Sequence, residues 1–526
     1  MKRLLALVLC VALLAGCVPA GVLDQFGITH FRDMEYVRPD LDALEKSCRE
    51  AADLAAVSGD VREVLMGVWD FYDVYDDYFT NYDLAYIHYH ADLNDEFWQT
   101  EYGFCAENAG QPDMLLEELY TALAESPLRA ELEEEYFGEG FLEDYGGEPF
   151  YDEELLSLLT REQELIAEYY AIGAETTAES ETDAWYDECT LPMAQVLAEL
   201  VILRNQIARQ VGFESYTDYA WEVSYYRDYT AAQAEAYLAD IRRELVSLYE
   251  NMNAMDVWTA ADAPCSEYEV LSHVKKAARK MGGIVREAHT VMELAGLFDV
   301  SPDPRKSGLS FELYLDRYRE PYIMISGTGT AYDKLSFAHE FGHFAMDYAA
   351  GGSWAGTDVL EVFSQGMEYL SLVHGGAEGD FVRMKLADSL CTYVEQAAYA
   401  DFELRLYRLE EEELTAEKLL ALYEQVGADY GFRSLQWDPR DMVTIPHFYE
   451  TPMYVISYVV SNDAAMQLYE MELHAPGTGA ACLQEHLTTE CEGLMAFLRE
   501  AELKSPFDRI AEVREIMEGY FGEKTE

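Results

Sequence analysis

The sequence predicts a mainly α-helical fold with one small β-sheet. Apolar residues recur at intervals of three and four in several segments of the 526-residue chain, which is the spacing of an amphipathic helix. Near the start of the chain this spacing is seen at Leu41, Leu44, Cys48, Ala51 and Ala55. The one convincing alternation of period two covers residues 309–314, and the apolar run 321–326 follows after a polar turn, so we expect a single hairpin. Half of the residues are apolar, which is enough for a large core in one elongated domain or two lobes.

The expected helices follow one another along the chain. Residues 39–124 have a helical pattern with short interruptions. Two acidic or polar stretches, 131–154 and 175–187, predict loops or insertions. A helix is expected over 191–210, and another begins with the capping box Thr-Ala-Ala-Gln at residues 230–233. The apolar face of that last helix would consist of Leu238, Ile241, Leu245, Leu248 and Met252.

Residues 338–344, Ala-His-Glu-Phe-Gly-His-Phe, contain the pattern H-E-x-x-H. On a helix, side chains four residues apart lie on one face about 6 Å apart, so His339 and His343 could bind one zinc ion. Glu340 follows the first histidine and would act as a general base towards a water molecule at the metal. No proline interrupts the surrounding segment, and the glycines at 351–352 would end the helix soon afterwards. The pattern therefore predicts a zinc site on a helix.

A second helix is expected to supply a third ligand, because H-E-x-x-H alone also occurs by chance in long helical sequences. The polar residues after the glycine-containing link recur at intervals of three and four, so they share one helical face with apolar residues opposite. These polar residues are Asp358, Glu361, Gln365 and Glu368. The alternative interpretation is a solvated acidic face in a very acidic protein.

Together the two segments resemble the oligoendopeptidase F and thimet oligopeptidase family of zinc metallopeptidases. Members of that family follow H-E-F-G-H with a helix of the form E-x-x-S-x-x-x-E, which residues 361–368 match at every fixed position. The resemblance implies that Glu361 is the third zinc ligand. It also implies that Asp358 and Glu368 accept hydrogen bonds from the imidazole rings and hold them in the metal-binding tautomer.

Residues 445–458 combine one histidine with three tyrosines. On its own this cluster is typical of an ordinary core, because the chain contains 39 tyrosines. The run I-P-H-F-Y followed by a tyrosine-bearing helix also resembles the substrate loop of the same family. That resemblance implies that His447 and Tyr458 hydrogen-bond the scissile carbonyl or its oxyanion, with Tyr454 as a further helper.

The hairpin has two interpretations. By analogy with the family, the backbone of residues 322–327 would hold an extended peptide as an added strand. The alternative is a hairpin with a structural role only.

The resemblance covers about residues 190–510 and implies function as well as fold. It implies a two-lobed helical zincin-type peptidase with a deep substrate channel and its small sheet near the zinc site. We expect a lipoprotein signal peptide over 1–16, an N-terminal helical region with acidic insertions over 17–190 and a catalytic region over 191–526. With one Zn²⁺ per chain, the protein would hydrolyse internal peptide bonds of oligopeptides.

Two other functions fit the same motifs. A peptidyl-dipeptidase or carboxypeptidase would need a cation for the terminal carboxylate of its substrate. Basic residues near the hairpin in sequence are Arg305, Lys306, Arg317 and Arg319. The second alternative is a catalytically inactive, lipid-anchored peptide-binding protein, although binding alone would not require Glu340.

The chain is strongly acidic, since 36 Lys and Arg against 100 Asp and Glu give a formal net charge of −64. This balance excludes nucleic acid as a natural partner, because phosphate binding needs a basic surface. The excess of acidic residues fits either plain surface solvation or a preference for cationic peptides. We expect a monomer.

The first residues are expected to direct export. Lys2 and Arg3 precede an apolar run over 4–14, whereas a membrane-spanning helix needs about 20 residues. The sequence Leu-Ala-Gly-Cys that ends at Cys17 resembles a bacterial lipobox, which implies cleavage before Cys17 and a lipid on its sulfur. We therefore expect an extracytoplasmic protein held to the bacterial membrane only by this lipid, or secreted after cleavage behind Ala20. The seven cysteines that follow Cys17 are scattered and odd in number, so no disulfide framework is predicted.

Overall fold

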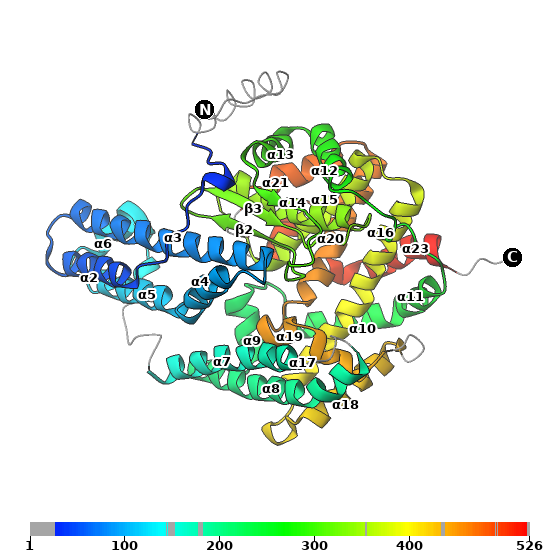
Figure 1. Cartoon of the computed structure of the whole chain (residues 1–526), viewed down its shortest axis with the longest axis horizontal. Helices are drawn as coiled ribbons and strands as arrows, with labels where there is room; N and C mark the ends of the chain where they lie inside the picture. Colours follow the sequence, from blue (N-terminus) through cyan, green and yellow to red (C-terminus); the bar gives the residue numbers. More distant parts are fainter. Residues whose placement is uncertain are drawn as a thin grey trace. The chain divides into compact units, whose positions relative to one another are not determined.

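The computed structural model describes residues 27–143, 145, 153–176, 182–352, 355–432, 437–489, 491 and 493–522. Most of these residues lie in α-helices, and the named strands form a three-stranded sheet (Figure 1). The predicted mainly helical fold with one small sheet is therefore confirmed. The predicted signal peptide and Cys17 lie outside the described residues. No helix in the described part of the chain combines the length and apolarity needed to cross a membrane.

The described residues divide into two compact units. The first unit contains the residues before 153 together with 283–328 and 344–352, and the second unit contains the others. This division differs from the boundary predicted at 190/191. The difference arises because residues 153–190 contribute helices to the second unit, whereas the hairpin belongs to the first.

The helices of the first unit include α2 (Leu41–Val57), α3 (Val61–Ala91), α4 (Glu96–Glu107), α5 (Gly110–Ala124), α6 (Arg129–Leu132) and α13 (Gly283–Ala295). Buried residues of α2, α3, α5 and α6 form one apolar core. The side chain of Asp40 accepts a hydrogen bond from the Ala43 N–H and so caps α2. The apolar residues of α2 are buried as their spacing predicted, against apolar residues of α3 and α5.

The two stretches predicted as loops are partly helical. In the first stretch, α6 continues as a π-helical turn over Glu133–Phe137, and α7 starts at Glu153. In the second, α8 already starts at Asp183. The acidic residues are compatible with helices because neighbouring apolar side chains such as Leu132 and Trp185 are buried and glutamate favours helix. Residues 144, 146–152 and 177–181 of these stretches lie outside the described part.

The sheet has the strand order β1-β3-β2. Its strands are β1 (Phe298–Asp299), β2 (Phe311–Leu315) and β3 (Glu320–Met324). The predicted hairpin is present, with Phe311 opposite Met324 in an antiparallel pair. Sequence reasoning missed β1, because two residues are too few for an alternating pattern.

The position of β3 corrects one expectation about substrate. β3 is the central strand, and β1 runs parallel to it on the side away from β2. The N–H of Ile323 donates to the Leu297 carbonyl at 3.1 Å, and the N–H of Ile325 donates to the Asp299 carbonyl at 2.8 Å. The expectation that a peptide adds to this strand as a further strand is therefore wrong over Ile323 to Ile325, where the edge is already paired.

The second unit is mainly helical. Besides two helices that pack along each other, it contains α7 (Glu153–Glu175), α8 (Asp183–Gln210), α9 (Tyr216–Tyr219), α10 (Ala231–Glu244), α11 (Val246–Asn253), α12 (Glu267–Met281), α16 (Gly379–Cys391), α17 (Ala397–Leu406), α18 (Ala416–Asp429), α19 (His447–Glu450), α21 (Thr478–His486), α22 (Leu494–Glu500) and α23 (Ile510–Phe521). The two helices that pack along each other are α15 (Thr357–Gly375) and α20 (Ile456–His474) (Figure 1). Residues 361–372 of α15 are all buried. The alternative of a solvated acidic face on this helix is therefore wrong.

Two local predictions in the second unit are confirmed. The Thr230 hydroxyl accepts from the Gln233 N–H, and the Gln233 side chain accepts from the Thr230 N–H, as in a capping box. The apolar face that follows is buried, although Leu245 separates α10 from α11. The seven cysteines of the described part are free, and three of them, Cys48, Cys105 and Cys189, are buried.

Candidate metal centre

The helix that carries H-E-x-x-H lies unusually close to α15. It is α14 (Asp333–Ala350), and the glycines after it adopt positive φ angles of 80° at Gly351 and 100° at Gly352, as the predicted helix end requires. A methyl group on Gly342 would lie 2.5 Å from the Phe363 carbonyl oxygen and 2.5 Å from the Ser364 Cα. Only glycine allows the two backbones to approach this far, which brings the histidines of α14 to the acidic residues of α15.

The three predicted zinc ligands meet at this contact. The Nε2 atom of His339 lies 3.4 Å from Oε2 of Glu361, and Nε2 of His343 lies 3.9 Å from the same oxygen. One donor atom from each of the three residues falls within 4.8 Å of the others, a grouping found nowhere else in the described ranges. Two imidazoles and a carboxylate are a donor set that suits a catalytic zinc ion. That these residues bind zinc stays a prediction.

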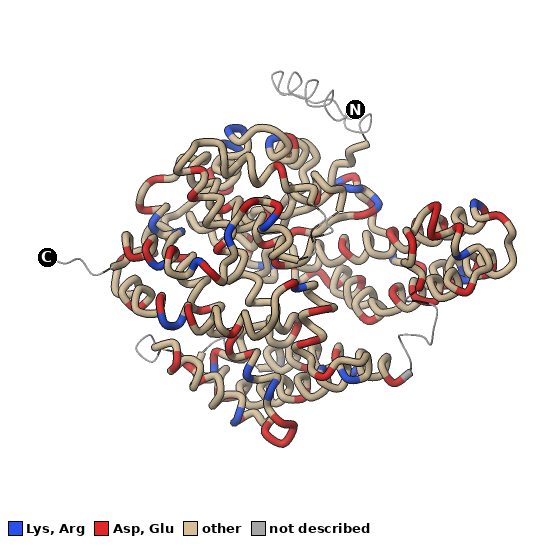
Figure 2. Tube along the Cα trace, turned by 180° about the vertical axis from the view of Figure 1, so that it is seen from behind, with Lys and Arg blue, Asp and Glu red and all other residues tan. Residues whose placement is uncertain are grey.

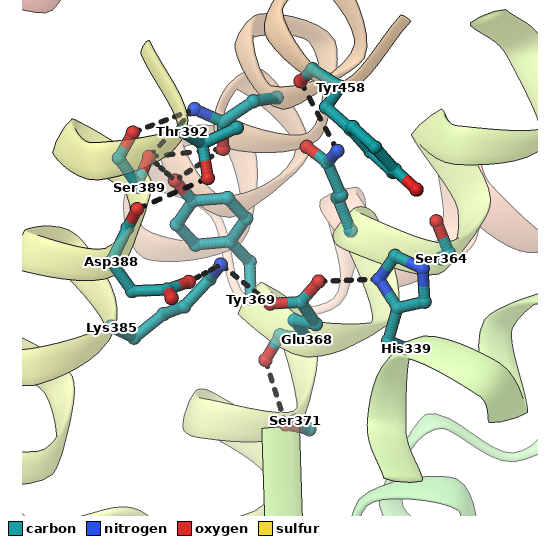
Figure 3. A network of polar contacts seen from close by, with 12 residues as sticks. His339, Ser364, Glu368, Tyr369, Ser371, Lys385, Asp388, Ser389, Thr392 and Tyr458 are labelled. Atoms are coloured by element: carbon teal, nitrogen blue, oxygen red, sulfur yellow. Dashed lines mark hydrogen bonds and ion pairs between the residues drawn. The ribbon is translucent and has the colours of Figure 1, made fainter. Parts of the chain in front are cut away.

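Glu368 fixes the orientation of His339, as the resemblance implied. Its Oε1 lies 2.8 Å from Nδ1 of the imidazole, so the Nε2 atom faces Glu361. On the other side, Nζ of Lys385 lies 2.6 Å from Oε2 of Glu368 and 2.8 Å from Oδ2 of Asp388. Figure 3 shows this chain of contacts from His339 to Asp388. Burial would raise the pKa of Glu368, but Lys385 and His339 outweigh that effect and lower it, so the carboxylate is charged.

Asp358 does not have the role expected for it. It contacts no imidazole; its Oδ1 accepts a hydrogen bond from the Ser457 hydroxyl at 2.5 Å and lies 3.5 Å from Nε of Arg227. The reason is its position in the first turn of α15, one turn before Glu361, where the helix packs against the start of α20. Asp358 therefore joins two helices instead of orienting a metal ligand.

Glu340 is a buried carboxyl with a raised pKa. It lies between the two histidines of the motif in sequence, and 8% of its surface is exposed. Burial raises its pKa, the positive charge of His339 lowers it, and Glu361 and Glu368 raise it, with a result of about 7. A carboxylate with a pKa near the working pH can both accept and return a proton.

The pKa values of the two histidines are shifted in opposite directions. Burial lowers the pKa of both. At His339 the hydrogen bond to Glu368 and the charge of Glu361 outweigh burial and raise the pKa to about 10. At His343 burial dominates and the pKa falls to about 4. The site therefore attracts positive charge, which a divalent cation would supply.

The predicted aromatic residues lie beside the same carboxylate. The Tyr454 hydroxyl donates to Oε1 of Glu361 at 2.6 Å, and the Ser364 hydroxyl donates to Oε2 at 2.8 Å. The Tyr458 hydroxyl lies 3.4 Å from Nε2 of His447. Burial and then the charge of Glu361 raise the pKa of both tyrosines well above the usual value, so both stay protonated as donors. Burial lowers the pKa of His447, which favours its neutral form.

Known proteins are similar to this chain in part of its sequence and in its fold. Residues 31–143 match the family model described as the Peptidase M3 N-terminal domain. The solved structure of PZ peptidase A with an inhibitor superposes with a TM-score of 0.80 at 19% identity, covering 93% of this chain and 99% of that one. A protein of Bacillus anthracis str. Ames, provisionally described as oligoendopeptidase F, gives a TM-score of 0.76 at 19% identity, with 94% and 98% coverage. The chain has the oligoendopeptidase fold.

Another structure provisionally described as oligoendopeptidase F agrees, with a TM-score of 0.77 at 20% identity over 94% of this chain and 99% of that chain. No curated protein matches the sequence. The oligoendopeptidase fold extends over nearly the whole chain, including the region upstream of residue 190 where sequence motifs were weak. At such low identity these structures establish the architecture, and the function has to be argued from the site.

Proposed function

We propose that this protein is a zinc-dependent endopeptidase that hydrolyses internal bonds of oligopeptides. The observation that carries the proposal is the convergence of His339, His343 and Glu361, with the buried Glu340 next to the first ligand. The oligoendopeptidase fold supports it. A bound zinc ion would acidify water and polarise the scissile carbonyl. Proton transfer and stabilisation of the developing negative charge would fall to residues of this chain.

Glu340 would move the proton. It would take a proton from the attacking water and give it to the amine that leaves, and a pKa of about 7 suits both transfers. Its burial keeps bulk water from competing for that proton. Glu361 would not replace it, because its carboxylate would serve as a ligand of the metal.

The protonated tyrosines would stabilise the developing negative charge. The Tyr458 hydroxyl and Nε2 of neutral His447 lie 3.4 Å apart. Both groups could therefore donate a hydrogen bond to one oxygen of the substrate. Tyr454 donates to Glu361 and would so hold the third ligand in place; its part as a helper towards the substrate stays a prediction.

The test is the variant Glu340→Gln, which keeps size and hydrogen bonding but removes the base. We expect it to retain bound zinc and to lose cleavage of an internally quenched oligopeptide by about 10²–10⁴-fold. Cleavage at the wild-type rate would rule out the proposed base. If the wild type binds zinc and peptide but cleaves nothing in a mixed peptide library, the inactive binding protein becomes the better interpretation.

Three of the four basic residues near the hairpin already pair with carboxylates, which favours an endopeptidase over an exopeptidase; Arg319 is not among these pairs. Arg305 pairs with Asp92 and Asp303, Lys306 pairs with Asp299, and Arg317 pairs with Asp77. A peptide acetylated at its start and amidated at its end separates the two activities. We expect its internal bonds to be cleaved as fast as those of the unblocked peptide. An absolute need for a free terminus would establish an exopeptidase.

We also propose the location outside the cytoplasm, with a lipid on Cys17. The support is the lipobox-like sequence alone. Metabolic labelling with a fatty acid should label the wild type and not the Cys17→Ala variant. Labelled protein in both, or in neither, would contradict the anchor.

A further inference from the structure

Met453 adopts a backbone conformation that is rare for its residue type. It lies between α19 and α20, directly before Tyr454, and its φ angle is +69°. This left-handed region is unfavourable for residues with a Cβ. Its side chain is buried, with 2% of the surface exposed. A residue in this conformation persists only when its surroundings hold it there.

Two buried ionisable side chains hold the two peptide groups of Met453. Its N–H donates to Oε1 of Glu403 in α17 at 2.7 Å. Its carbonyl accepts from Nη2 of Arg227 at 2.7 Å. Glu403 is 1% exposed and the Arg227 side chain is fully buried. The two bonds come from residues more than 170 positions apart in sequence, so together they form a tertiary clamp on one residue.

Arg227 is itself fixed from several sides. Its guanidinium lies 4.4 Å from the ring centre of Trp221 and 4.4 Å from that of Tyr225. Nη2 also donates to the Ser457 hydroxyl at 3.0 Å, and Nε lies 3.5 Å from Oδ1 of Asp358. A guanidinium that lies close to two aromatic rings, with Nη2 and Nε engaged, has little freedom to move.

These contacts reach α15 and α20, two of the helices that meet at the candidate site. Asp358 lies one helical turn before Glu361 on α15, and Ser457 is the residue before Tyr458 on α20. The clamped Met453 is the residue before Tyr454, whose hydroxyl donates to Glu361. A shift at Arg227 or Glu403 would therefore change the placement of both tyrosines relative to Glu361.

We propose that Arg227 and Glu403 are positioning residues, which hold Met453 in its left-handed conformation and thereby place Tyr454 and Tyr458 against Glu361. The expected effect on catalysis rests on the proposed function. The expected effect on the positions of the two tyrosines rests on geometry alone.

A matched pair of variants tests the clamp at Glu403. Glu403→Gln keeps an oxygen that can accept from the Met453 N–H, whereas Glu403→Leu does not, and neither variant can ionise. We expect kcat of the leucine variant to fall about 10–100-fold below that of the glutamine variant, since small misplacements have such effects, with KM within about threefold. Adding Met453→Gly to the leucine variant should restore most of kcat, because glycine adopts φ > 0 without strain. Equal kcat for the two Glu403 variants, or no restoration by glycine, would overturn the proposal.

A second pair covers the case in which the leucine variant does not fold. Met453→Ile and Met453→Leu have similar volume, but the β-branched side chain tolerates the left-handed region far less well. The isoleucine variant should have the lower kcat, and equal values for the two would contradict the clamp.

A readout without activity separates this proposal from the proposed function. A fluorine label on the Tyr454 ring should give a ¹⁹F resonance that moves in Glu403→Leu and returns in the double variant with Met453→Gly. This result is expected even if the wild type cleaves no peptide, which would count against the proposed function only. An unmoved resonance in a folded Glu403→Leu variant would overturn the clamp.

Discussion

Gly342 decides how closely the two ligand-bearing helices meet. We expect Gly342→Ala to lower the free energy of unfolding by at least about 1–3 kcal/mol, the usual effect of overpacking, because the added methyl would collide with backbone atoms of α15. Zinc affinity should fall in parallel, as measured by competition with a chromophoric chelator. Gly519→Ala in α23 is the matched control, since nothing lies within 4 Å of its added methyl; it should be neutral or slightly stabilising. A fully stable, zinc-binding Gly342→Ala protein would contradict the close contact.

At the residue scale, sequence reasoning found the groups that lie near one another along the chain. His339, Glu340 and His343 share one helix, and their spacing alone predicts a shared face. Glu361 needed the resemblance to a family. Residues such as Lys385, Arg227 and Glu403 carry no local signal, because a buried ion pair depends on distant elements that meet only in the folded protein. The sequence did contain one hint at the close contact, the glycine inside H-E-F-G-H.

At the scale of elements, α16 supports α14 through one lysine. Lys385→Met should weaken zinc binding about 10–100-fold, the usual effect of disturbing a residue behind a metal ligand, because Glu368 would lose the cation that holds it. If Lys385 acts through Glu368, the same substitution should have little further effect in a Glu368→Gln background, which a double-mutant cycle of zinc affinities measures.

The control for this cycle is Lys306→Met in the first unit. Lys306 is also a buried lysine, with 1% of its side chain exposed, and it pairs with Asp299. Its replacement should lower stability without changing zinc affinity. Equal losses of zinc affinity in both lysine variants would assign the effect to general destabilisation.

Glu403 in α17 makes the free energy of unfolding depend on pH. Burial raises the pKa of this carboxyl, the Met453 N–H and nearby arginines lower it, and the result is about 8. An unfolded chain loses the proton at about pH 4.3. Between these values the folded state binds more protons, so wild-type stability should fall as the pH rises towards 8.

Glu403→Gln removes this titration. Relative to the wild type, it should therefore become more stable from pH 5 to pH 8.5, by an amount on the order of a few kcal/mol. Urea unfolding curves of both proteins at the two pH values measure the difference. A constant difference between the two proteins across this range would contradict the raised pKa.

The elements themselves were predictable where periodicity or capping was strong. The helix around residue 339, the α15 segment, the hairpin and the capping box at Thr230 all have local patterns. β1 was missed because it is two residues long, and α6 and the start of α8 were missed because acidic residues suggested loops. At α6 and at the start of α8, the burial of a few apolar side chains outweighed the acidic residues and allowed a helix.

At the scale of the whole molecule, charge is the dominant feature. Figure 2 shows acidic residues along most of the traced chain and far fewer basic ones, in line with the net charge of −64. Such an excess opposes the compact state by self-repulsion, and salt screens it. We expect Tm to rise when NaCl is increased from about 10 mM to 0.3 M, where the Debye length falls well below 10 Å.

Acidic pH supplies the control for this salt effect. Near pH 4.5 many carboxyl groups take up protons, so the same addition of NaCl should change Tm much less. A salt effect that is absent at pH 7.5, or that has the same size at both pH values, would show that self-repulsion does not limit stability.

The central claim concerns zinc and peptide hydrolysis together, and one measurement tests it most directly. Soluble protein that starts after Cys17 is assayed for zinc content and for cleavage of an internally quenched oligopeptide, before and after a chelator and after zinc is added back. The account predicts about one zinc per chain, as one donor set of this kind requires, with cleavage lost to the chelator and restored by zinc. Cleavage that persists without zinc, or a protein that takes up no zinc at all, would contradict it.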